Sequence, residues 1–290
     1  MQSDWIETFL DLMDSRSFNK TADRLGVTQS TVSARINALE DLVGARLFLR
    51  SRAGTEPTTE ALRFAPHARI LRQEWTLARR SVEKRGSIAL TLRISIQNDL
   101  AHAQLGPLVG DLRRLLPQTA FYIEPDYSAQ MCADLVTGTQ DFAVMFSPKP
   151  QPSLHFESVG VIPYRLISSH ARRMEEIDVE RYVMAHFSPA FETVHRATLP
   201  ALSAAPVSVG QSSAVESLLR EIGGSGYVME PRARGMVDMG QFHWVADAPI
   251  LDQPVYAAMH ERNRTQRAFR QMVQLVRARL APERAATEPR

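Results

Sequence analysis

The chain has little cysteine and no long apolar run, and each shortage excludes a class of protein. Its 290 residues include one cysteine, Cys132, which cannot form an intramolecular disulfide or complete a cysteine-rich zinc site. No stretch approaches the roughly 18 consecutive apolar residues of a membrane span. The first residues carry acids where a secretory signal peptide needs bases. We therefore expect a cytoplasmic protein that makes no membrane contact.

The usual sequence marks of catalytic and cofactor sites are also missing. The eight histidines show no H-x-x-x-H or close Cys/His spacing, which predicts that no metal is bound. We find no nucleophile elbow, phosphate loop or dinucleotide fingerprint. The sequence thus predicts a protein that has no cofactor and is not an enzyme. An enzyme whose catalytic residues meet only in the fold stays as the alternative.

Length and charge suggest how the chain is divided. A chain of 290 residues favours two or three compact units, and 44% hydrophobic with 23% charged residues is ordinary for a folded protein. Residues 1–86 carry 14 Lys+Arg and 11 Asp+Glu (+3), and the rest carry 20 and 21 (−1), which together give the net +2. Residues 16–52 hold seven bases against three acids. That excess suits a polyanionic partner, although a solvated surface gives the same count.

Residues 1–58 carry the pattern of three helices and a hairpin. Apolar residues recur at helical spacing from Trp5 to Met13. Ser17 is a good N-cap for a second helix, and Gly26 can take the left-handed conformation that ends it. Thr28 caps a third helix. The apolar residues expected to share one face of that third helix are Val32, Ile36, Leu39 and Val43.

The remaining surface of the third helix is polar and nearly free of acids. Hydroxyl, amide and guanidinium groups bond to base edges and phosphates, and the second helix of a helix-turn-helix enters the major groove. Residues 47–49 then predict a strand before a turn at Ala53 and Gly54, with Arg50 and Arg52 near its tip. Such a wing can reach phosphates or a narrow minor groove. A generic three-helix core with a polar face stays as the alternative.

These residues resemble the N-terminal signature of LysR-type transcriptional regulators. The resemblance spans about 45 residues and rests on Ser17, Phe18, Thr21, Ala22, Leu25, Val27, Gln29, Val32, Ser33, Ile36, Leu39, Glu40, Gly44, Leu47, Phe48, Arg50 and Thr58. Thr21, Pro57 and Ala61 depart from the usual pattern. With the resemblance, the residues expected to contact DNA are Lys20, Thr28, Gln29, Ser30, Thr31, Ser33, Arg35, Arg50 and Arg52.

Residues 59–86 predict a linker and dimerisation helix. Apolar residues follow alternating steps of three and four, which is a heptad seam; the seam residues are Ala61, Phe64, Ala68, Leu71, Trp75, Ala78 and Val82. Pro66 should bend this helix or mark a late start. The seam fits a partner helix, and packing against the chain's own second domain is the alternative. The resemblance implies a homodimer or a homotetramer.

Residues 88–290 alternate strand-like and helix-like segments, which predicts an α/β domain. The resemblance implies a two-lobed, periplasmic-binding-protein-like effector domain, with lobe I at about 88–160 and 264–290 and lobe II at about 161–263. In such sheets a ligand lies beyond the carboxyl ends of the strands, near helix N-termini. That rule selects Asn98, Asp99, Ser128, Ser147, Gln211, Ser212 and Ser213, each of which is also a plausible helix cap.

Asp99 shapes the expected ligand. Its carboxylate can cap the donors at the start of its own helix and would repel a second anion there. We therefore expect lobe I to favour a neutral, hydroxylated or amine-bearing group. We expect the better seat for a carboxylate to be formed by Gln211, Ser212 and Ser213. An amphoteric or neutral metabolite is the resulting hypothesis.

Together, the residue patterns and the resemblance predict a sequence-specific, DNA-binding transcriptional regulator that is controlled by a small-molecule effector. Its expected partners are double-stranded promoter DNA, the effector, further copies of the chain and RNA polymerase. A transport binding protein would share the C-terminal fold but would have no use for residues 1–86. The sequence does not tell which effector or operator is bound, or whether transcription rises or falls.

Overall fold

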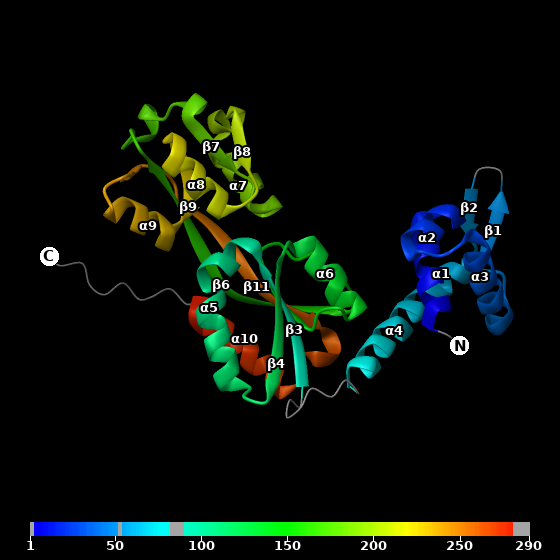
Figure 1. Ribbon diagram of the computed structural model, residues 1–290. Helices are drawn as coiled ribbons and strands as arrows, with labels where there is room; N and C mark the ends of the chain where they lie inside the picture. Colours follow the sequence, from blue (N-terminus) through cyan, green and yellow to red (C-terminus); the bar gives the residue numbers. More distant parts are fainter. Residues whose placement is uncertain (1–2, 52–53, 82–89, 281–290) are drawn as a thin grey trace. The chain divides into compact units, whose positions relative to one another are not determined.

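The chain forms two compact units in a computed structural model that describes residues 3–51, 54–81 and 90–280 (Figure 1). The first unit holds residues 1–87 with 136–139, and the second holds residues 88–135 and 140–290. Over these described ranges, no helix is long and apolar enough to cross a membrane.

The first unit is a helical domain with a short hairpin, and its elements begin and end where local signals predict. They are α1 (Ser3–Ser15), α2 (Phe18–Leu25), α3 (Gln29–Val43), β1 (Phe48–Ser51), β2 (Gly54–Pro57) and α4 (Thr59–Ser81). The Ser17 side chain accepts a bond from the backbone N–H of Lys20, and Gly26 ends α2 with a left-handed φ of 63°. Thr28 caps α3 in the same way. These caps confirm the predicted turn between α2 and α3.

One apolar core joins the helices and the hairpin of this unit. Phe9 lies at its centre, with ring centroids 5.6 Å from Phe48 of the hairpin and 5.2 Å from Phe64 of α4. Val32, Ile36 and Leu39 of α3 are buried as predicted, but Val43 is 40% exposed. Val43 is the last residue of α3 before its Gly44 cap, so the apolar face ends one turn earlier than its spacing suggested.

Helix α4 divides its seam between two environments. Ala61 and Ala68 are buried in the core of the first unit and Phe64 packs against it, whereas Leu71 (40%) and Trp75 (52%) are exposed. The first half of the predicted seam therefore covers α1 rather than a partner. Ala78 is also exposed, and Val82 lies outside the described residues. Pro66 lies inside α4, so it does not mark a late start.

The second unit is built on one nine-stranded sheet with the order β4-β3-β5-β11-β6-β9-β7-β8, and β10 (His243–Trp244) pairs with β6. One side of the order holds the parallel strands β3 (Leu90–Gln97), β4 (Thr119–Asp126) and β5 (Phe142–Met145). The other side holds β7 (Tyr182–Ala185), β8 (Val207–Val209) and β9 (Ser225–Met229). Helices α5 (Asn98–Leu115), α6 (Ser128–Thr137) and α10 (Arg267–Leu280) accompany the first set, and α7 (Pro189–Thr198), α8 (Ser212–Ile222) and α9 (Glu230–Asp238) the second.

Two long strands connect the resulting lobes. β6 (Leu154–Ser168) and β11 (Leu251–His260) pair antiparallel along ten positions and run from one lobe into the other (Figure 1). Their register shifts between Val255 and Tyr256, opposite Gly160, which is the bulge expected where a strand changes direction. β6 continues through Gly160 and Pro163 as one strand of 15 residues.

Candidate DNA-binding and effector-binding sites

The first turn of α3 presents an ordered group of hydroxyls. The Thr28 Oγ1 atom accepts a bond from the backbone N–H of Thr31 (3.2 Å) and lies 2.8 Å from the hydroxyls of both Ser30 and Thr31. Thr28, Gln29 and Ser30 are exposed, and so is Lys20 on α2. The cap therefore fixes α3 while leaving an amide and hydroxyls open to a partner, which is the chemistry that reads base edges.

Arg35 does not share this outward direction. Its guanidinium donates to the Asp4 carboxylate of α1 at 2.9 Å and to the Thr8 hydroxyl at 3.3 Å. Arg35 follows Val32 by three residues and precedes Leu39 by four, so it lies beside the buried face and reaches α1. The DNA contact that we expected at Arg35 stays a prediction.

The other residues predicted to contact DNA are half-buried or lie partly or wholly outside the described residues. Thr31 and Ser33 are half-buried on α3. Arg50 belongs to β1, but its side chain is outside the described residues, and Arg52 is outside them altogether. The structure confirms the hairpin in which both were expected, since β1 and β2 pair antiparallel from Phe48 opposite Pro57 to Ser51 opposite Gly54.

Glu40 fixes the wing to α3. Its side chain is 6% exposed, and its Oε1 accepts the backbone N–H groups of Leu47 (2.7 Å) and Phe48 (3.1 Å). Its Oε2 accepts from Arg46 at 2.7 Å. The Thr58 hydroxyl donates to the Leu47 carbonyl from the other end of the hairpin. A buried carboxylate thus sets where the wing leaves the helix, a role that the sequence analysis did not assign.

In the second unit, four of the predicted effector residues follow strands β3, β4 and β5, namely Asn98, Asp99, Ser128 and Ser147. The Ser128 hydroxyl donates to the Gln97 side-chain oxygen (3.0 Å) and accepts the backbone N–H of Ser147 (3.2 Å). Ser128 and Ser147 are therefore brought together, and Gln97 joins them. Gln97 was missed although it directly follows the strand-like run of β3, which was the available signal.

Hydrogen bonds between described side chains and backbone groups cross from this lobe to the other. The backbone N–H of Ser212, at the start of α8, donates to Asp99 Oδ1 at 2.5 Å. Gln211 donates its amide to the Tyr127 hydroxyl at 3.3 Å. The Arg232 guanidinium of α9 lies 3.3 Å from His102 Nε2. Asp99, Gln211 and Ser212 therefore meet across the lobes, as a shared site requires.

Asp99 caps the opposite lobe rather than its own helix. The Asp99 carboxylate, expected at the start of α5, instead bonds the first turn of α8. This places it on the backbone donor at which we expected the ligand's carboxylate. Asn98 is half-buried as the first residue of α5, and Ser213 is exposed.

Burial raises the pKa values of ionisable side chains where the two lobes meet. Desolvation raises the pKa of Asp99 to about 6, with a further rise from Glu216 that the Ser212 hydrogen bond opposes. Burial, and then the charges of Asp99 and Glu216, hold the pKa of Tyr164 well above its usual range. Glu216 is bonded by Arg232 at 2.8 Å. Tyr127, Tyr164 and Glu216 were all missed, because no local pattern marks a residue that reaches the cleft from another element.

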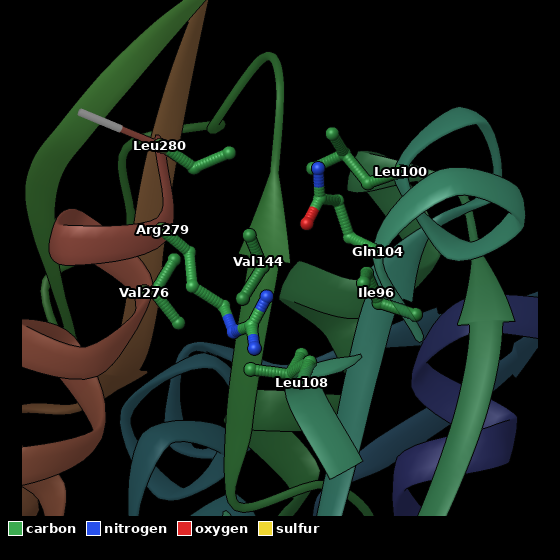
Figure 2. A pocket seen from close by; sticks show the side chains of 8 residues that line it. All are labelled: Ile96, Leu100, Gln104, Leu108, Val144, Val276, Arg279 and Leu280. Atoms are coloured by element: carbon green, nitrogen blue, oxygen red, sulfur yellow. The ribbon is translucent and has the colours of Figure 1, made fainter. Parts of the chain in front are cut away.

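A separate pocket lies within the first lobe. Figure 2 shows it between β3, β5, α5 and α10; its lining residues are Ile96, Leu100, Gln104, Leu108, Val144, Val276, Arg279 and Leu280. Its lining is mostly apolar, and the Arg279 guanidinium is bonded by Asp111. None of the predicted effector residues line it, so it is distinct from the polar cluster at the strand ends.

Cys132 and His195 are buried inside the second unit. Among the residues with described positions, no group of three or more His, Cys, Asp or Glu side chains could hold a metal ion. Cys132 is buried on α6, as expected of a small core residue. His195 is fully buried, and its Nε2 lies 2.7 Å from the Tyr182 hydroxyl inside the second lobe.

Comparison with known proteins agrees with both halves of this arrangement. Residues 3–62 match the model of the bacterial regulatory helix-turn-helix protein, lysR family, and residues 85–281 match the LysR substrate binding domain. The HTH-type transcriptional regulator HdfR of Salmonella typhimurium is 26% identical over 264 residues, which cover 89% of this chain and 91% of HdfR.

Solved structures share the fold over nearly the whole chain. LysG of Corynebacterium glutamicum gives a TM-score of 0.57 at 20% identity, covering 96% of this chain and 97% of LysG. A full-length OxyR variant of Pseudomonas aeruginosa gives 0.58 at 18% identity, covering 100% and 99%. The chain therefore belongs to the LysR family, the DNA-binding transcriptional regulators that join an N-terminal helix-turn-helix to an effector-binding domain.

Proposed function

We propose that the first turn of α3 and the wing bind promoter DNA in this protein. The observation that carries the proposal is the exposed group formed by Thr28, Gln29 and Ser30, with Lys20 exposed on α2. A helix that presents short polar groups from its N-terminal turn can enter a major groove about 12 Å wide. The Arg50 and Arg52 wing would add phosphate contacts. Arg35, which bonds Asp4 of α1, would add a contact beside this group.

Fluorescence anisotropy with the promoter duplex beside the protein's own gene tests this. Gln29→Ala should weaken specific binding by about 5-fold to 100-fold, since one good base contact is worth about 1–3 kcal/mol, while binding to a scrambled duplex changes little. Gln151→Ala, at an exposed position of the second unit, is the matched control and should bind as wild type. Equal binding by Gln29→Ala and wild type would place the reading surface elsewhere.

We further propose that the exposed half of α4 pairs two copies of the chain. Leu71 and Trp75 continue the seam beyond the part that the first unit covers, and both are exposed. Trp75→Asp would place an unpaired charge in a helix pair and should give monomers in light scattering. Arg79→Asp, at another exposed position of α4, is the control for the charge itself. An unchanged assembly in Trp75→Asp would contradict a seam at this position.

The polar cluster across the lobes is the proposed effector cleft. It joins Asp99, Gln211 and Ser212 with Ser128 and Ser147 at strand ends, where ligands bind in open α/β sheets. LysG, which shares the fold, was solved with a bound effector arginine. An effector that changes the lobe contacts would change promoter affinity or contact with RNA polymerase. Fluorescence anisotropy on the promoter together with in vitro transcription, each with and without the effector, distinguishes these outcomes.

A further inference from the structure

Besides the Ser147 hydroxyl oxygen, the proposed effector cleft contains three buried polar atoms that have no partner within the described part of the chain. They are Asp99 Oδ2, Ser212 Oγ and the Tyr164 hydroxyl, in residues that are 4%, 3% and 0% exposed. Asp99 and Ser212 are in direct contact, and the Tyr164 hydroxyl lies within electrostatic range of Asp99. Asp99 bonds the backbone of Ser212, and its charge raises the pKa of Tyr164. Buried polar groups are nearly always bonded, so these atoms are the ones that a bound ligand would satisfy.

The chemistry of these atoms restricts that occupant. Asp99 Oδ2 only accepts when ionised, and the two hydroxyls can accept as well as donate. A group with several N–H donors would therefore satisfy all three atoms. A carboxylate would instead face Asp99 and Glu216, and the Ser212 N–H that might hold it is already bonded to Asp99.

The charge balance of the cleft points the same way. Glu216 is matched by Arg232, which bonds both of its oxygens at 2.8–3.3 Å. Asp99 has a backbone N–H but no basic side chain among its bonded partners. A buried carboxylate without a counter-charge is costly, and a bound cation relieves that cost.

We propose that Asp99, Ser212 and Tyr164 form a cation subsite, where the effector presents a protonated amine or a guanidinium. Asp99 Oδ2 accepts one proton of that group, and the Ser212 and Tyr164 hydroxyls accept others. This inference rests on the proposed effector cleft. It replaces the carboxylate seat expected at Ser212, because Asp99 holds the backbone donor there.

Thermal unfolding of the full chain with five probes tests the subsite. The probes are 1,4-diaminobutane, agmatine, L-lysine, succinate and L-glutamate, at pH 7.5, where Asp99 is ionised. At least one of the three cations should stabilise wild type. Calorimetry should show that cation binding at least tenfold weaker to Asp99→Asn, which keeps the shape and the Ser212 bond. Asp252→Asn, an exposed acid on β11, should bind as wild type.

Each other outcome overturns a defined part of the argument. Cation binding that Asp99→Asn leaves unchanged, stabilisation by the two acids alone, or no stabilisation by any probe overturns the cation subsite. Acid binding that Gln211→Ala weakens would keep the effector cleft and remove only its preference for cations. A probe that binds equally to Gln211→Ala, Asp99→Asn and wild type would remove the cleft as well.

Discussion

Replacing Glu40 should lower the free energy of unfolding of the DNA-binding unit by more than the loss of an exposed ion pair would. The carboxylate is buried, and its Oε1 accepts two backbone N–H groups at the start of the wing. Glu40→Ala leaves the N–H groups of Leu47 and Phe48 buried without a partner. Each such loss costs about 1–3 kcal/mol, so we expect the free energy of unfolding to fall by about 3 kcal/mol.

Urea unfolding followed by fluorescence measures this in the full chain. Of the three tryptophans, Trp5 packs against the core of the first unit, so replacing Trp75 and Trp244 with Phe isolates its signal. With a urea m-value of about 1.5 kcal/mol/M, the midpoint should fall by about 2 M. Glu40→Gln keeps an oxygen for both N–H groups and should lose less.

Arg46→Ala removes the ion pair of Glu40 and keeps its bonds to the backbone, so this variant measures the ion pair alone. The Arg46 side chain is 75% exposed, and such a pair contributes at most about 1 kcal/mol. If Glu40→Ala destabilised the first unit no more than Arg46→Ala does, the backbone bonds would not hold the wing, and our account of Glu40 would be wrong.

Two further predictions concern the second unit. Burial lowers the pKa of His195 to about 4, so the stability contributed by its neutral form is lost as pH falls from about 6.5 to 4. Burial raises the pKa of Asp99 to about 6, so the stability contributed by its protonated form is lost as pH rises from about 4 to 6. These two effects act in opposite directions. Asp99→Asn should therefore increase the loss of unfolding free energy between about pH 6.5 and 4 toward about 3 kcal/mol, measured by urea unfolding. An unchanged loss would contradict this prediction. Gly224 has φ of 99°, and an added Cβ would overlap the Arg181 carbonyl oxygen, so Gly224→Ala should cost about 3 kcal/mol or more in the same assay. Gly235→Ala, in open space within α9, should be neutral or stabilising, and equal midpoints for the two variants would contradict the steric argument.

Local sequence signals were sufficient for the first unit because each acts within a few residues. Ser17, Gly26 and Thr28 determine where α2 and α3 begin and end through bonds to neighbouring backbone groups. Periodicity located the buried face of α3, but it could not place the long Arg35 side chain, which reaches α1. The seam of α4 was likewise visible, whereas its division between the core and an exposed half depends on tertiary packing.

The effector cleft could be predicted only in part, for a physical reason. Strand ends and helix starts are local features, so the sequence placed Ser128, Ser147 and Ser212 at such positions. The bond from Ser212 to Asp99 joins residues 113 positions apart, and no spacing rule links them. Strand β7 and helix α7 were also missed, although Ser188 caps α7 and Pro189 follows at its first position.

Directed DNA cleavage tests most directly whether α3 enters the operator. The native Cys132 is buried, so Gln29→Cys adds the accessible thiol needed to attach an iron chelate. Our account predicts cuts in the promoter duplex at two sites about one helical turn, or a multiple of it, apart, as two copies in adjacent major grooves would give. The same chelate at Gln151→Cys, in the second unit, should not produce this pattern. Cuts spread evenly along the duplex, or stronger cuts from position 151 than from position 29, would contradict DNA reading by α3.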